Sequence, residues 1–173
     1  MRFAPPPPEP GASPQLDAIV LRDTGGVESD EPNADPALVA PALAALQAAV
    51  PGVSELSDFW FEDDSVYFTF PDPAFRGRAV SGHYDGELHL GSPAFSDSPT
   101  FPIAAIDPAV ATALTEGLAS RFPTLRVIRP RLNPELSYEL GLSWHVDLDD
   151  GRGNLGTVYS DLDGTVTVVD VRP

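Results

Sequence analysis

The feature that most constrains the fold of this 173-residue chain is an internal repeat. The tripeptide Asp-Pro-Ala at residues 35–37 recurs 72 residues later at 107–109, and residues 63–90 align without a gap on residues 141–168 at an offset of 78. The difference between the two offsets corresponds to one insertion of six residues. Because a repeat encodes one supersecondary unit used more than once, we expect two tandem units of the same fold.

Each copy is predicted to open with a helix. Asp35 and Asp107 each precede a proline, so the Asp oxygen caps a free amide while the proline takes the first helical position, where no amide donor is needed. Pro41 lies beyond the first turn and should kink the first helix or delay its start. Each helix should end at a proline, Pro51 or Pro123. Apolar residues follow the two caps at helical spacing: Val39, Leu43, Leu46 and Val50, then Val110, Leu114, Leu118 and Phe122.

After each helix, apolar residues alternate with polar ones, which is the pattern of a β-strand with one wet face. The clearest case is residues 136–148, where every even-numbered residue is apolar, and it predicts one long strand. In the first copy, the same alternation at Val66, Phe68 and Phe70 predicts a second strand. Residues 59–61 indicate an added strand that ends in an acidic turn.

A hairpin is expected around each Asp-Gly pair, at residues 85–86 and 163–164. We favour a three-residue loop that ends in a left-handed glycine, because it places the apolar residues of each hairpin on one face. This register pairs His83 with Glu87 and Ser81 with His89. The residues that it groups on the apolar face are Val80, Gly82, Leu88 and Leu90 in the first hairpin and Val158, Ser160, Val166 and Val168 in the second.

The composition divides the chain into four segments. Residues 1–34 combine a proline run with acidic residues and are expected to form a largely disordered tether, in which residues 16–21 are a candidate edge strand. Residues 35–92 form the first predicted repeat, residues 93–106 a linker and residues 107–173 the second repeat. Each repeat is expected to be one helix packed on an antiparallel meander of three to four strands, so the fold class is α+β. Whether the two sheets merge stays open.

The composition also excludes several classes of function. The net charge is −16 and all ten basic residues are arginine, which disfavours nucleic acid as a partner because phosphate contacts need clustered basic residues. Without cysteine there is no disulfide and no thiolate metal site. No nucleophile motif and no P-loop lysine is present, so we expect no enzyme and no cofactor. No segment is apolar enough to insert into a membrane.

The order of predicted elements resembles the PepSY and PepSY-like domains. The residues that carry the resemblance are Leu142-Ser143-Trp144-His145-Val146-Asp147, followed by Val158, Asp163-Gly164 and Val166. The lead from Phe101-Pro102-Ile103 into Ile106-Asp107-Pro108-Ala109 also looks like lipoproteins and membrane-anchored proteins of actinobacteria with such tandem units. The resemblance covers about residues 35–171. It implies a non-catalytic module outside the cytoplasmic membrane that binds or inhibits proteins such as peptidases.

Two groups of residues are candidate binding sites. In the favoured register, His83, Glu87 and His89 share the solvent face of the first hairpin, and two imidazoles with a carboxylate suit a metal such as zinc. The alternative is a solvated hairpin face with a His-Glu pair. Arg121, Arg126, Arg129 and Arg131 form a basic island within the insertion, which we interpret as a partner-binding loop. Its alternative is that these arginines pair with the protein's own carboxylates.

These observations favour an extracytoplasmic protein-interaction or ligand-binding module, secreted or tethered to the cell envelope, with an unidentified protein partner. No signal peptide is visible, but Met1 is the only methionine, which suggests that a leader once preceded the chain and anchored it. The alternative is an acidic cytoplasmic decoy that occupies a basic site on a partner. The decoy hypothesis requires Met1 to be the first residue of the natural protein. An enzyme or metal sensor built on the histidine hairpin ranks below both.

Overall fold

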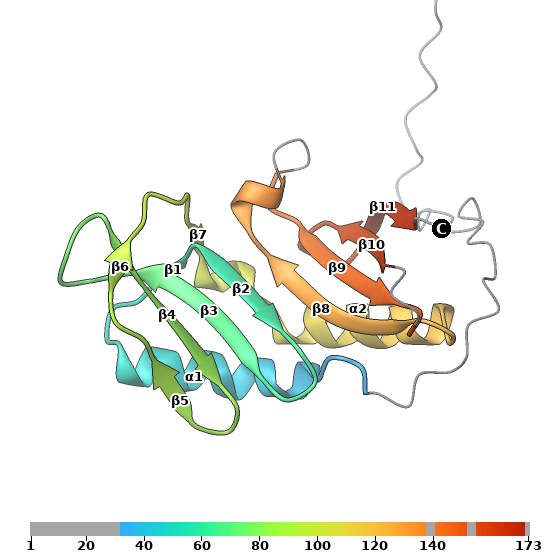
Figure 1. Ribbon diagram of the computed structural model, residues 1–173, viewed down its shortest axis with the longest axis horizontal. Helices are drawn as coiled ribbons and strands as arrows, with labels where there is room; N and C mark the ends of the chain where they lie inside the picture. Colours follow the sequence, from blue (N-terminus) through green and yellow to red (C-terminus); the bar gives the residue numbers. More distant parts are fainter. Residues whose placement is uncertain (1–31, 138–140, 152–154, 172–173) are drawn as a thin grey trace, which may run out of the picture.

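The computed structural model describes residues 32–137, 141–151 and 155–171. Within these ranges the fold is α+β, with two α-helices and a large antiparallel sheet (Figure 1), so the predicted fold class is confirmed. Most of the predicted tether, including the candidate edge strand at 16–21, lies outside the described residues. Ala34 at its end is buried and donates its amide to the carbonyl oxygen of Val127 at 2.7 Å.

Both helices begin at the predicted Asp-Pro pairs. The Asp35 carboxylate accepts a hydrogen bond from the amide of Ala37 at 2.9 Å, and Asp107 accepts one from Ala109 at 2.8 Å. In the first copy a 3-10 turn, η2 (Pro36–Leu38), precedes helix α1 (Val39–Ala49). Pro41 therefore delays the α-helix, because it has no amide hydrogen to bond the carbonyl four residues earlier. The second helix, α2 (Pro108–Arg121), starts directly after its cap.

The helices bury most of the predicted apolar stripes. In α1, Val39 and Leu46 are fully buried and Leu43 nearly so. In α2 the buried face is rotated, so that Val110 and Phe122 are only half-buried at its margin. The buried residues of α2 are Ala111, Leu114, Thr115 and Leu118.

The strands of the described residues are β1 (Glu55–Leu56), β2 (Asp58–Phe61), β3 (Val66–Pro71), β4 (Arg78–Tyr84), β5 (Leu88–Leu90), β6 (Ala94–Phe95), β7 (Phe101–Pro102), β8 (Arg126–Leu132), β9 (Trp144–Asp149), β10 (Leu155–Ser160) and β11 (Val166–Val171). In this part of the chain, nine strands form one sheet in the order β11-β10-β9-β8-β2-β3-β4-β5, with β6 also paired to β4. The short strands β1 and β7 pair with each other. The predicted added strand at 59–61 is confirmed as part of β2.

The pairing of β2 with β8 joins strands that lie far apart in the sequence. Phe59 pairs with Leu132 and Trp60 pairs with Arg131. The strands of the first and second halves of the chain therefore belong to a single sheet, which answers the question that the sequence left open.

One face of this sheet packs against both helices, which lie along the same side of it in Figure 1. Phe59, Phe61 and Trp144 are fully buried on this face. The two phenylalanine rings meet the indole edge-on, at centroid distances of 6.2 and 6.4 Å. Because β2 and β9 lie on either side of β8, these aromatic contacts make the core continuous across the junction of the two halves.

The predicted strand over residues 136–148 is wrong in its first half. Residues Pro134–Ser137 form a 3-10 turn, η4, and β9 begins only at Trp144. Gly141, just before β9, has a φ of 73°, a left-handed conformation that is incompatible with a strand. From Trp144 onward the predicted alternation holds, with Val146 and Leu148 buried and the odd-numbered residues half-exposed.

Strand β8 corrects the interpretation of the basic island as a loop. Its charged residues and its internal proline do not match the usual pattern of a strand, because proline cannot donate to a β-ladder. Val127, Pro130 and Leu132 are the buried residues of this strand. The register with β9 shifts between Val127 and Arg129, next to the proline, which is where such an irregularity is expected.

The segment 93–106, predicted as a linker, carries β6, β7 and a 3-10 turn, η3 (Ile103–Ala105). Phe101, Ile103 and Ile106 are buried in it. This segment therefore contributes to the core as well as connecting the two halves.

The hairpin of β10 and β11 has the predicted three-residue loop. The amide of Asp161 donates to the carbonyl oxygen of Thr165 at 3.0 Å, and Gly164 has the expected left-handed φ of 88°. Ser160 and Val166 form the first pair, as predicted. Beyond this pair the ladder shifts by one residue, so that Val158 pairs with Val169 and the predicted register is wrong. The irregularity adds one residue to one strand, which no local turn signal reveals.

Candidate functional site

A single row of planar side chains crosses the open face of the sheet, opposite the helices. Its members occupy paired positions on consecutive strands from β5 to β10, and directly opposite residues share a face of an antiparallel sheet. All of them are half-buried or exposed. We call this set the planar row: His89, His83, Tyr67, Trp60, Arg131, His145 and Tyr159.

The first half of the row is a continuous stack of rings. The rings of His89 and His83 are nearly parallel, with centroids 4.7 Å apart. Tyr67 lies 5.9 Å from His83 and stacks on Trp60 at 4.9 Å, with an angle of only 6° between the planes. Such stacking holds each side chain in one orientation, so this half of the surface is rigid before anything binds to it.

Arg131 links the two halves of the row. Its guanidinium carbon lies 5.3 Å from the centre of the Trp60 ring, in a cation–π contact. Beyond Arg131, the rings of His145 and Tyr159 stack at 4.8 Å with an angle of 4°. The row as a whole was not predicted from the sequence, since the pairing of Trp60 with Arg131 joins positions 71 residues apart.

The arginines of β8 are paired with the protein's own carboxylates. Arg131 bonds both oxygens of Asp58, with Nε to Oδ1 at 2.8 Å. Arg129 and Arg126 reach the carboxylates of Glu62 and Asp149, at 3.1 and 3.5 Å respectively. For these three arginines the geometry agrees with the alternative interpretation of the basic island. Its remaining member, Arg121, lies apart from them in the last turn of α2.

His145 sits in an environment that favours its neutral form. Its side chain is 19% exposed, and this burial lowers the pKa of the imidazole below its usual value of 6.5. The positive charge of Arg131 acts in the same direction. The carboxylate of Asp147, 3.7 Å from Nε2, acts against it. His145 is therefore an uncharged aromatic surface at neutral pH.

The hairpin of β4 and β5 ends the row and contains the candidate metal ligands. His83 pairs directly with His89, and Tyr84 with Leu88, so the loop is residues 85–87 with Gly86 at its centre. The predicted register, in which His83 faced Glu87, is therefore wrong by two residues. The three-residue length of the loop and a shared face for the two histidines are confirmed, but the glycine lies at the centre of the loop and not at its end as predicted.

Packing on the other face accommodates this register. Gly82 lies between Phe68 on one neighbouring strand and Leu90 on the other. A Cβ at this position would come within 2.8 Å of both side chains, and within 2.8 Å of the His89 carbonyl oxygen. In the observed register the glycine leaves room for these two large apolar side chains.

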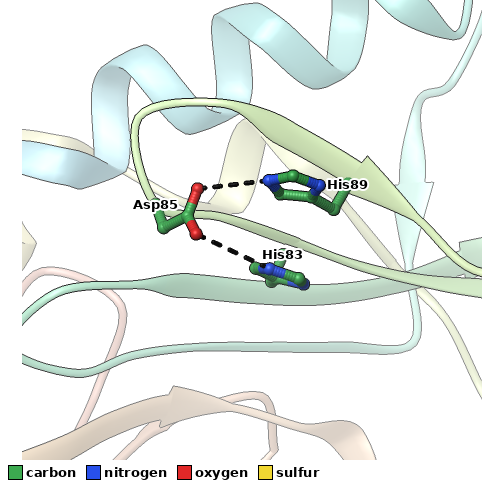
Figure 2. Close-up of side chains that lie close together, drawn as sticks. All are labelled: His83, Asp85 and His89. Carbon is green, nitrogen blue, oxygen red and sulfur yellow. Dashed lines mark ion pairs between the residues drawn. The ribbon is translucent and has the colours of Figure 1, made fainter.

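The observed register places Asp85 between the two histidines (Figure 2), where Glu87 was expected. The carboxylate oxygens of Asp85 lie 3.9 Å from Nε2 of His83 and 3.3 Å from Nε2 of His89. A hydrogen bond from the backbone amide of Glu87 and the nearby histidines lower the pKa of the Asp85 carboxyl. Of the predicted triad, the structure thus brings His83 and His89 together and replaces Glu87 with Asp85.

A shallow hollow of about 340 Å³ adjoins this hairpin. Its lining combines Trp60, Tyr67, His83 and His89 of the planar row with residues from positions on the other face, Phe68, Gly82 and Leu90. The hollow is largely apolar and adjoins the stacked half of the planar row. It is therefore a place where an apolar or aromatic group of a partner can enter.

Compared with known proteins, the chain matches no family model, no curated protein and no solved structure. Among the described residues, no helix combines the length and the apolar character needed to cross a membrane.

Proposed function

We propose that this chain is a non-catalytic protein-interaction module whose binding surface is the open face of the sheet. The observation that carries the proposal is the planar row. Tryptophan, tyrosine and arginine dominate the energetics of protein interfaces, because they bury a large area with few rotatable bonds. Here Trp60, Tyr67, Arg131 and Tyr159 lie in one line and are already stacked or ion-paired. Binding would therefore cost little side-chain entropy.

We further propose that the module consists of two tandem PepSY-like units, each one helix on an antiparallel meander. The strand order supports this proposal. Outward from the β2–β8 pair, one direction gives β3, β4 and β5 and the other gives β9, β10 and β11. Each set of strands follows a helix that starts at an Asp-Pro cap. A binding role outside the cytoplasmic membrane is the function that the PepSY resemblance implies.

The charge of the protein indicates the chemistry of the partner. On the open face, the arginines of β8 are neutralised by the carboxylates that they contact. The net charge of −16 is therefore carried mainly by other parts of the chain. A partner that fits this distribution has an apolar or aromatic centre surrounded by basic residues. Nucleic acid does not fit it, because like charges repel.

The experiment compares capture of a partner by the full chain and by two variants. Trp60→Ala with Tyr159→Ala removes two half-buried rings from the row, whereas Glu116→Gln changes one exposed carboxylate on α2. We expect the double variant to lose the captured partner and Glu116→Gln to retain it, with circular dichroism showing that both variants fold. Equal capture by the double variant would refute the open face as the binding surface.

A second candidate, the acidic decoy, is favoured only by the net charge. The two proposals differ in their dependence on salt. A decoy held by long-range attraction should release its partner as the ionic strength rises to 0.5 M, since the Debye length is about 10 Å at 0.1 M and shorter above it. A partner centred on the planar row should stay bound. Fractionation of producing cells tests the proposed extracytoplasmic location, and recovery from the cytoplasm alone would support the decoy.

A further inference from the structure

We propose that the hairpin of β4 and β5 binds one Zn²⁺ ion through Nε2 of His83, Nε2 of His89 and a carboxylate oxygen of Asp85, with a fourth position open to water. This proposal depends on the hairpin alone and is independent of any protein partner.

The distances between the ligand atoms are already close to those of a zinc site. Zinc bonds nitrogen and oxygen at about 2.0–2.2 Å in a tetrahedron, so two ligand atoms of one site lie about 3.3 Å apart. The distance from His89 Nε2 to Asp85 Oδ1 is 3.3 Å, and from His83 Nε2 to Asp85 Oδ2 it is 3.9 Å. All three ligand atoms lie within 4.8 Å of one another. Side-chain rotations that bring one oxygen of Asp85 close to both Nε2 atoms would close the site.

The backbone of the hairpin holds these three residues in place. His83 and His89 are directly opposite each other on paired strands, and the ladder continues through β3. Gly86 has a φ of 108°, which lets the chain turn within three residues. The amide of Glu87 donates to Asp85 Oδ1 at 3.4 Å. The Asp85 carboxylate points toward both histidines (Figure 2). Metal binding would therefore require adjustment of the side chains but no rearrangement of the backbone.

The donor set selects the class of metal. Two imidazole nitrogens and one carboxylate suit borderline ions such as zinc, whereas magnesium and calcium prefer oxygen ligands alone. The three side chains are 42–49% exposed, so an ion reaches them from solvent without opening the fold. Three protein ligands and an open position are the pattern of an accessible zinc site rather than of a closed structural one.

The test uses the three histidines of the chain as reporters. In a titration of the full chain with ZnCl₂, followed by the NMR signals of the imidazole rings, we expect the signals of His83 and His89 to change together and saturate at one equivalent. His145, on the other half of the sheet, is the internal reference and should not change. MgCl₂ at the same concentrations should move none of the three. Equal changes at His145, or no change at His83 and His89, would overturn the proposal.

Variants of the turn separate a built site from adsorption of zinc to this acidic surface. Asp85→Asn removes a proposed ligand, and the matched control Glu87→Gln removes a carboxylate two residues away. By calorimetry, Asp85→Asn should weaken zinc binding at least about 10-fold, since even the loss of a residue that only supports a ligand typically costs about 10–100-fold in affinity. Glu87→Gln should change it less than about 2-fold. The double variant His83→Ala with His89→Ala defines the background, and a wild-type signal equal to that background would show adsorption only and refute the site.

Discussion

The pairing of Arg131 with Asp58 across the junction of β8 and β2 leads to a prediction about stability. Arg131→Met keeps most of the aliphatic stem and removes the guanidinium. The lost interactions are a two-point bond to a carboxylate and a cation–π contact with Trp60. Hydrogen bonds to charged groups contribute about 1.5–3 kcal/mol, but the side chains of Arg131 and Asp58 are 31% and 16% exposed, which lowers this value. With a further contribution of about 0.5 kcal/mol from the ring contact, we expect a total loss of about 2 kcal/mol.

The assay is a double-mutant cycle in urea. The free energy of unfolding is measured for wild type, Arg131→Met, Asp58→Ala and the double variant, with a constant denaturant slope as the check on two-state unfolding. We expect a coupling energy of about 1 kcal/mol between the two residues. A coupling energy below about 0.3 kcal/mol would refute the argument that this pair holds the two halves of the sheet together.

Arg129 provides the matched control, because it lies on the same strand and pairs with Glu62. The side chains of Arg129 and Glu62 are 47% and 30% exposed, so solvent weakens their attraction. Arg129→Met should therefore cost less than about 1 kcal/mol, and its coupling to Glu62 should fall further in 1 M salt. If both arginines showed the same cost and the same salt dependence, exposure would not be what distinguishes them.

Three more predictions follow from single residues. Folding lowers the pKa of His145, so the stability that its neutral form contributes is present above pH 6.5 and is lost as the pH falls below it; His145→Gln should show a smaller loss between pH 7 and pH 5 in urea unfolding. Gly82→Ala should destabilise the fold by about 1–3 kcal/mol through overpacking against Phe68, and an unchanged melting temperature would contradict the fit described for this hairpin. Asp107→Ala should cost about 1 kcal/mol by removing the cap of α2, whereas Asp107→Asn, which caps equally well, should leave thermal unfolding nearly unchanged.

Local signals in the sequence were enough to place the helices and most of the strands. An aspartate followed by proline supplies both a cap and a compatible first residue, so the starts of both helices were predictable. The alternation in β3 and in the later part of β9 likewise depends only on neighbouring residues. Strand β8 was missed because its charges are neutralised by Asp58 and Glu62, about 70 residues earlier in the chain.

Only part of the candidate metal site could be predicted from local signals in the sequence. The sequence placed His83 and His89 on one face correctly, because they share a face whether the three-residue loop is residues 84–86, as predicted, or residues 85–87, as observed. The third ligand depends on the register itself, which also sets Gly82 between Phe68 and Leu90. That choice put Asp85 between the histidines and left Glu87 in the turn.

The sequence by itself determined the α+β class, the caps and the one-sided apolar faces, because each follows from the conformational preferences of residues close together in the chain. Only the tertiary structure decided that the strands form one sheet through β2 and β8, and that seven planar side chains line up across it. The physical reason is that strand pairing between distant segments depends on their combined burial, shape and charge. A pattern within one segment does not indicate which other strand that segment will pair with.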